Sequence, residues 1–173
     1  MQYKVVKMQN SSSMCMVCGL DNHYSLKAHF FETEEDYVVC QMRISDIYQS
    51  YPDRVHGGMV TTLLDEIMGR ANMVHDPEGF SVTAKMDTHF LLPVPLNEDF
   101  YMTAHITRNT RLLYEASSEL ILSDGSIAAR AWGKYVKTSL DKIDKHHATH
   151  GVWIYDTDYL VPDFFEIPNT VES

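Results

Sequence analysis

One segment of the chain has the periodicity of an amphipathic helix, and this segment constrains the fold most. Its apolar residues recur at spacings of three and four: Val60, Leu63, Leu64, Ile67 and Ala71. On a helical wheel these residues occupy a sector of roughly 100°. The pattern predicts a helix from about Gly58 to Val74, and Pro77 and Gly79 then end it. A lone helix with one apolar face must bury that face against other elements.

Strand-like segments lie on both sides of this helix, and two hairpin signals join some of them. The turn signals are Thr33–Asp36 and the pair Asp124-Gly125. The predicted strands are Tyr3–Met8, Lys27–Glu32, Tyr37–Ile44, Ser81–Leu92, Phe100–Thr107, Leu113–Leu122 and Ile127–Thr138. The simplest architecture is α+β, with a curved antiparallel sheet wrapped around one long central helix.

This pattern predicts one domain over residues 1–138, with residues 1–26 as a lead-in. Residues 139–173 form an extension rich in aromatic and acidic side chains, which we do not expect to be a separate domain. The aromatic side chains indicate that the extension docks on its own domain or on a neighbouring chain. The sequence gives it no role.

Charge and cysteine content narrow the functional classes. Lys and Arg number 14 against 24 Asp and Glu, and the formal net charge of -10 argues against nucleic acid or an anionic membrane as a partner. No apolar run approaches the roughly 18–20 residues that a membrane span needs, and the N-terminus lacks the apolar core of a signal peptide. Three cysteines are too few for a disulfide framework, so we expect a protein of the reducing cytoplasm.

The residues at the start of the predicted helix suggest a site. Gly57 and Gly58 follow His56, and adjacent glycines let a ligand approach the backbone N–H groups at the positive end of a helix. Such groups can stabilise a carbonyl oxygen that gains negative charge. Asp65 lies two turns later, and a carboxylate there can act as general base or nucleophile. From spacing alone, an ordinary turn and a solvated carboxylate explain the same residues.

Several segments resemble hotdog-fold acyl-CoA thioesterases of the phenylacetic-acid-pathway (PaaI-like) type. The central one is Tyr51–Gly69, in which His-Gly-Gly is followed at fixed spacing by Asp65. The others are Thr83–Pro95, Asp124–Ala131 and the upstream Cys15–Asn22. The resemblance covers about residues 15–138 and leaves the C-terminal extension outside it.

The resemblance implies a homodimer, or a tetramer made of two such dimers, with active sites between subunits. It implies that the Gly57 or Gly58 N–H polarises the thioester carbonyl and that His56 orients this loop. It further implies that Asp65, facing the other chain's Gly57, is the base or nucleophile, and that the Thr83 hydroxyl holds the water. The implied reaction hydrolyses an acyl-CoA to free acid and CoA, with no cofactor.

Further residues are candidates for substrate binding. Some relatives have Asn or Gln in the loop before His-Gly-Gly, and whether Gln49, Ser50 or neither takes that place is open. Asp53 stands where glycine is common in similar sequences. Lys85 and Arg130 could meet CoA phosphates, although a solvated sheet face explains them equally well. The full candidate set is Gln49, Ser50, Thr61, Thr62, Met68, Gly69, Asn72, Lys85 and Arg130.

Two other interpretations remain. A non-catalytic acyl-CoA-binding or sensing module could use the same fold, whereas a hydratase would need a paired His and acid that we do not find. Cys15-x-x-Cys18 could be half of a zinc site with His23 or His29, but no second cysteine pair exists, so we expect no metal. The acyl group is not predicted.

Overall fold

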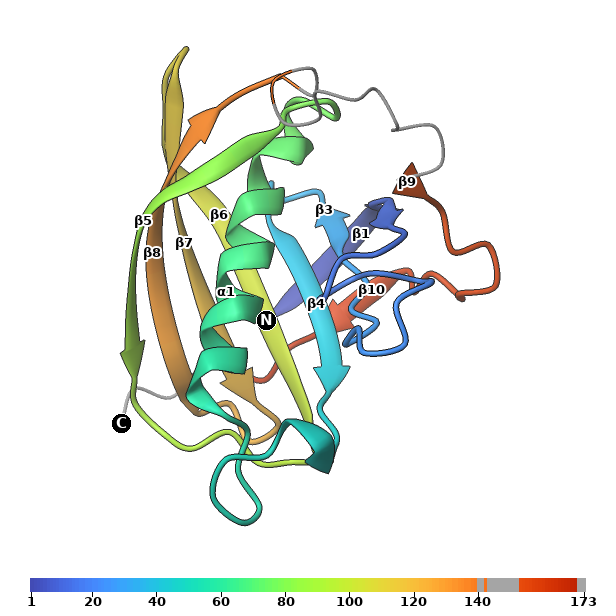
Figure 1. Cartoon of the computed structure of the whole chain (residues 1–173), viewed down its shortest axis with the longest axis vertical. Helices are drawn as coiled ribbons and strands as arrows, with labels where there is room; N and C mark the ends of the chain where they lie inside the picture. The colour runs from blue at the N-terminus through green and yellow to red at the C-terminus, as the bar shows by residue number, and fades with distance from the viewer. Residues whose placement is uncertain (140–141, 143–152, 171–173) are drawn as a thin grey trace.

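The computed structural model describes residues 1–139, 142 and 153–170. Within them, a large antiparallel sheet curves around one long helix, which confirms the predicted hotdog fold (Figure 1). The sheet order is β10-β1-β3-β4-β6-β7-β8-β5, and a separate pair joins β2 to β9. The strands are β1 (Gln2–Met8), β2 (Ser11–Ser12), β3 (Phe31–Thr33), β4 (Val38–Arg43), β5 (Ser81–Phe90), β6 (Asp99–Asn109), β7 (Leu113–Leu122), β8 (Ile127–Lys137), β9 (Trp153–Ile154) and β10 (Phe164–Glu166).

The central helix α1 spans Gly57–Arg70, and a 3-10 turn, η2 (Ala71–Val74), continues it to the predicted end. A second 3-10 turn, η1 (Asp46–Tyr48), precedes it. Leu63, Leu64 and Ile67 are fully buried against the concave face of the sheet. Alanines on β6, β7 and β8 leave room for the helix there. Each buried Leu or Ile contributes about 1.5–3 kcal/mol to folding, so the apolar stripe fixes which helix face meets the sheet. Within the described residues, no helix is both long and apolar enough to cross a bilayer.

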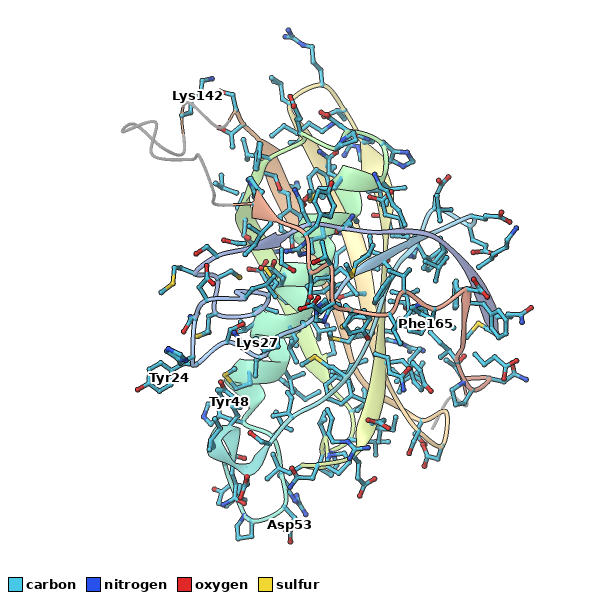
Figure 2. The ribbon with its side chains drawn as sticks, turned by 90° about the vertical axis from the view of Figure 1, so that its right-hand side faces the viewer. Tyr24, Lys27, Tyr48, Asp53, Lys142 and Phe165 are labelled. Carbon is cyan, nitrogen blue, oxygen red and sulfur yellow. The ribbon has the colours of Figure 1, made fainter. Side chains whose placement is uncertain are left out.

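The strand predicted over Lys27–Glu32 is wrong for most of its length, because β3 covers only Phe31–Thr33. Lys27 adopts a left-handed backbone conformation (φ 57°), which extended strand does not allow. Its ammonium group donates to the carbonyls of Gly19 and Leu20, and the Ala28 N–H bonds the Val17 carbonyl. Residues before β3 therefore pair with the lead-in, which lies on the side of the molecule where Figure 2 labels Tyr24, Lys27 and Tyr48.

The described part of the C-terminal extension packs on the domain. β10 pairs with β1, and Phe165 joins a second apolar cluster on the side of the sheet away from α1 (Figures 1 and 2). Nε2 of His29 lies 2.9 Å from Oδ2 of Asp156, and the Tyr159 ring stacks on His29 at 4.0 Å. Residues 140–141, 143–152 and 171–173 of the extension lie outside the described residues.

Strand β5 lies at one edge of the sheet and pairs only with β8 among the described strands. Its side chains are mostly exposed, including the apolar Val82 and Phe90. A ten-residue edge strand with exposed apolar side chains is a surface on which another strand can add.

Candidate active site

The loop before α1 ends at His56, which caps the helix. Nδ1 of His56 accepts a 2.9 Å hydrogen bond from the Gly58 N–H. A Cβ on Gly58 would come 3.0 Å from that Nδ1, so glycine permits the cap. No described group accepts a hydrogen bond from the Gly57 N–H. The sequence analysis left open whether the Gly57 or the Gly58 N–H donates to a ligand. Because the Gly58 N–H is bonded to His56, the Gly57 N–H is the available donor.

Asp65 lies on the α1 face that meets β5 and β8. Its Oδ1 accepts two hydrogen bonds of 2.9 Å each, one from the Thr83 hydroxyl and one from the Tyr135 hydroxyl. The Tyr135 hydroxyl also lies 3.2 Å from the Asp65 carbonyl oxygen. No hydrogen bond to Oδ2 occurs within the described part of the chain, so Oδ2 is left for a ligand or water. The structure thus brings Asp65 and Thr83 into direct contact.

Tyr135 is the site residue that sequence reasoning missed. Burial and the nearby Asp65 charge raise the Tyr135 pKa, so the hydroxyl keeps its proton and donates. Gly133 makes room for the ring, since a Cβ there would lie 2.6 Å from Tyr135 Cε2. The ring also stacks on Tyr114 at 5.0 Å. The sequence did contain a signal for this residue. In this strand of alternating burial, the other inward residues are Ala and Gly, so Tyr135 is the one inward side chain with a hydroxyl group.

A cavity of about 200 Å³ adjoins the Asp65 carboxylate. Trp153 of β9 reaches it from the C-terminal extension, and its ring lies 5.7 Å from that of Phe80. The lining therefore combines two carboxylates, one guanidinium, hydroxyl groups and aromatic rings. The lining residues are Asp65, Glu66, Gly69, Arg70, Met73, Gly79, Phe80, Ser81, Thr83, Tyr135 and Trp153.

Most of the other candidate residues on α1 and η2 pack in the core or bond the backbone. Met68 is 0% exposed and belongs to the apolar core. Thr62 donates from its hydroxyl to the Gly58 carbonyl at 2.8 Å, and Asn72, 1% exposed, donates to the Gly79 carbonyl at 3.1 Å. Thr61 is half-buried on the helix. Within the single chain, only Gly69 of these positions lines the Asp65 cavity.

Lys85 and Arg130 lie on the sheet face opposite to α1. Strict alternation would place Lys85 on the same face as Thr83, but the β5–β8 register shifts between these two residues. Lys85 consequently pairs with Asp87 at 3.0 Å and lies over the Trp132 ring. Arg130 bonds Glu119 at 2.9 Å. The single chain therefore does not bring these two cations to Asp65.

Gln49 and Ser50 are exposed in the loop before the helix. The side-chain oxygen of Gln49 accepts from the Asp53 N–H at 3.3 Å, and the Ser50 N–H donates to the Arg54 carbonyl at 2.9 Å. Asp53 lies at the tip of this loop (Figure 2) and has a φ of 63°. This left-handed conformation favours glycine but is tolerated by Asp. It explains how Asp53 can replace the glycine of similar sequences.

Within one chain, Gly57 and Asp65 cannot act on the same carbonyl group. They are eight residues apart along α1, which at a rise of about 1.5 Å per residue separates their backbones by about 12 Å. Gly57 lies beside the C-terminal end of β5, where a Cβ on Gly57 would contact the Phe90 ring at 3.6 Å. Asp65 lies beside the N-terminal part of β5, where it contacts Thr83. The two halves of the site therefore lie at opposite ends of β5.

Part of this chain is similar in sequence to known proteins. Residues 53–129 match the Thioesterase superfamily. Human acyl-coenzyme A thioesterase 13 is 28% identical over 83 residues, which are 48% of this chain and 59% of that protein, so the match spans little more than half of the relative.

Solved structures agree in fold. The E. coli PaaI protein of the phenylacetic acid degradation operon has a TM-score of 0.60 and 18% identity, covering 66% of this chain and 81% of that one. The smu.793 protein of Streptococcus mutans, solved with acetyl CoA bound, has a TM-score of 0.56 and 18% identity, covering 60% and 82%. The solved structures thus show a hotdog fold, and residues 53–129 of this chain and the region shared with the human relative are similar to the thioesterase superfamily.

Proposed function

We propose that the protein is an acyl-CoA thioesterase that hydrolyses an acyl-CoA to a free acid and CoA. The observation that carries this proposal is the Asp65 carboxylate, which two hydroxyl donors hold beside a small cavity in a thioesterase-superfamily domain. The name of the human relative supports an acyl-CoA substrate. The three unpaired cysteines are compatible with the reducing cytoplasm that we propose as its compartment.

We further propose that the active form is at least a dimer joined through β5. If two copies of this edge strand pair antiparallel, the end that carries Phe90 in one copy lies beside the end that carries Thr83 in the other. Gly57 contacts the first end and Asp65 contacts the second. Pairing therefore brings the Gly57 N–H of one copy toward the Asp65 carboxylate of its partner, and each dimer gains two equivalent sites.

In this arrangement, the Gly57 N–H at the helix N-terminus donates to the thioester oxygen as that oxygen gains charge. Such a donor contributes about 10²–10³ in rate. Oδ2 of Asp65 takes a proton from a water molecule that attacks the carbonyl carbon, while Thr83 and Tyr135 hold Oδ1. The CoA thiolate leaves without a strong general acid, because a thiol pKa near 8.5 makes it a fair leaving group. In a second form of the mechanism, Asp65 attacks directly and water hydrolyses the resulting anhydride.

A panel of acyl-CoAs, assayed for released thiol, tests the proposal. Asp65→Asn should lower kcat by about 100-fold or more, the low end of general-base contributions. Asp87→Asn is the matched control, because Asp87 lies on β5 but pairs with Lys85 on the other face of the sheet. The control should keep its rate. Binding of acyl-CoAs without thiol release by the wild type would instead identify a non-catalytic binding module.

One turnover in ¹⁸O-labelled water separates the two forms of the mechanism. With enzyme in excess over substrate, general-base catalysis places the label in the released acid. Direct attack, followed by attack of water on the Asp65 carbon of the anhydride, leaves an unlabelled Asp65 oxygen in the acid and places the label in the protein.

A further inference from the structure

Two thiols and an ion pair form a cluster beside α1, outside the residues assigned to hydrolysis. Cys15 and Cys18 come from the lead-in, and Glu66 and Arg70 come from α1. The two sulfur atoms and a Glu66 carboxylate oxygen all lie within 4.8 Å of one another. Arg70 bonds Glu66 at 2.8 Å through Nε, and its Nη2 lies 2.9 Å from the Cys18 Sγ.

The backbone of a tight turn holds the Cys15 sulfur atom in place. The Sγ of Cys15 accepts from the N–H groups of Val17 and Cys18, at 3.3 and 3.5 Å. The turn closes with a 2.9 Å bond from the Gly19 N–H to the Cys15 carbonyl. A Cβ at position 19 would lie 2.3 Å from that carbonyl oxygen, so the turn requires glycine.

The two thiols differ in acidity and access. A hydrogen bond from Cys18 lowers the Cys15 pKa to about 6, although burial and the Glu66 charge oppose this shift. The same hydrogen bond and burial raise the Cys18 pKa. Cys15 is half-buried, whereas Cys18 is 0% exposed. Cys15 is therefore the thiolate that solvent reagents can reach, and Cys18 is its protected neighbour.

Cys40 provides an internal comparison. It lies on β4, is fully buried in the apolar core, and burial raises its pKa to about 12. A thiol in such surroundings is inert.

We propose that Cys15 and Cys18 are an oxidation site at which a hydroperoxide produces an intramolecular disulfide. In the first step, the Cys15 thiolate attacks one peroxide oxygen, the S–O bond forms, the O–O bond breaks and hydroxide leaves. This converts Cys15 to a neutral sulfenic acid. In the second step, the Cys18 sulfur attacks the Cys15 sulfur, the S–S bond forms, the S–O bond breaks, and hydroxide leaves as water with the Cys18 proton. Overall, two thiols lose two hydrogens and hydrogen peroxide becomes two waters.

Arg70 explains why the second step follows the first. While Cys15 is anionic, Cys18 keeps its proton in the hydrogen bond between them. Once Cys15 is a neutral sulfenic acid, that bond no longer favours the protonated form. The guanidinium 2.9 Å away then stabilises a Cys18 thiolate.

The contact between the Arg70 guanidinium and the Cys18 sulfur also favours oxidation over metal binding. Cys15, Cys18 and Glu66 supply three donor atoms of a zinc type. However, a guanidinium already occupies hydrogen-bonding positions on both Cys18 and Glu66. A divalent cation at these atoms would lie next to that fixed positive charge.

The position of the tryptic sites allows a direct test on the full-length protein. Cleavage after Lys7, Lys27 and Arg43 places Cys15 and Cys18 on peptide 8–27 and Cys40 on peptide 28–43. The reduced protein is treated with one equivalent of hydrogen peroxide, its remaining thiols are alkylated, and the peptides are weighed. We expect peptide 8–27 to lose two hydrogens and escape alkylation, while peptide 28–43 is fully alkylated after denaturation.

Variants separate the two steps. Cys18→Ser should stop at the sulfenic acid, which dimedone traps on peptide 8–27, whereas Cys15→Ser should leave Cys18 unmodified. Cys40→Ala should oxidise like the wild type. The proposal is overturned if Cys40 oxidises as fast as Cys15 in the native protein. It is also overturned if Zn²⁺ alone binds stoichiometrically and protects both thiols from alkylation, which would identify a metal site.

Discussion

The hydroxyl of Thr83 on the edge strand donates a 2.9 Å hydrogen bond to Oδ1 of Asp65 on the central helix. This contact links the carboxylate that we propose as catalytic to the strand that we propose as the dimer interface. A substitution in β5 that moves Thr83 therefore changes the hydrogen bonding of the Asp65 carboxylate directly.

Removing the Thr83 hydroxyl should slow hydrolysis without unfolding the protein. Thr83→Val keeps the side-chain shape but loses the donor to Asp65, and we expect kcat to fall about 10-fold, consistent with a hydrogen bond to a charged group. Thr83→Ser restores the donor and should stay within about twofold of the wild type. Equal rates for the Val and Ser variants would show that the hydroxyl takes no part.

Tyr135→Phe tests the second donor. The Tyr135 hydroxyl bonds Oδ1 of Asp65, so its loss should lower kcat by about 10-fold and the free energy of unfolding by about 1 kcal/mol. Tyr114→Phe is a matched control, because that hydroxyl bonds the Gly69 carbonyl and Ser81 instead of the carboxylate. Tyr114→Phe should lower the free energy of unfolding, measured in urea, by a similar amount and leave kcat unchanged. A parallel loss of activity in both variants would indicate a packing effect.

The imidazole cap can be tested by stability alone. His56→Ala removes the acceptor of the Gly58 N–H and should lower the free energy of unfolding by about 1 kcal/mol. His56→Asn supplies a favoured capping side chain and should recover most of this loss. The measurement is urea denaturation followed by circular dichroism. An Asn variant as unstable as the Ala variant would contradict a capping role.

The proposed β5 interface predicts an oligomer that a charge should disrupt. Phe90→Asp places a carboxylate on the exposed edge, and we expect a shift toward monomer in analytical ultracentrifugation together with a loss of thioesterase activity. Leu160→Asp is the control, because Leu160 is 91% exposed but lies in the C-terminal extension. A wild-type protein that sediments as a monomer at assay concentration and remains active would reject the shared site.

The docked extension should respond to acid. A hydrogen bond from His29 lowers the Asp156 pKa below its ordinary value. A carboxyl group whose pKa is depressed by folding stabilises the docked state above its unfolded pKa of about 3.9, and this contribution is lost as the pH falls through the lower folded value. Hydrogen exchange over residues 153–160, corrected for intrinsic rates, should therefore accelerate below about pH 4. Asp156→Asn should remove this pH dependence, whereas Asp158→Asn should retain it.

The sequence predicted the long strands β5, β6, β7 and β8 to within about two residues at each end, and the predicted helix covers α1 together with the 3-10 turn η2. These elements have regular periodicity, and hydrophobic spacing is a local property. The short strands were less predictable. Ser11–Ser12, which is absent from the predicted strands, pairs with β9, and Lys27–Glu32 is mostly irregular because Lys27 bonds the lead-in. Their structure depends on partners that are distant along the chain.

The sequence by itself determined that one helix begins at His-Gly-Gly, that its Leu63–Ile67 stripe faces a sheet, and that Asp65 lies on another face. These properties follow from the 3.6-residue period of the helix. Tertiary structure decided which glycine amide is available, that Tyr135 and Thr83 share Asp65, and that Lys85 turns away at a register shift. Each of these outcomes depends on a cap geometry, a strand register or a contact between distant residues, and residue spacing does not encode them.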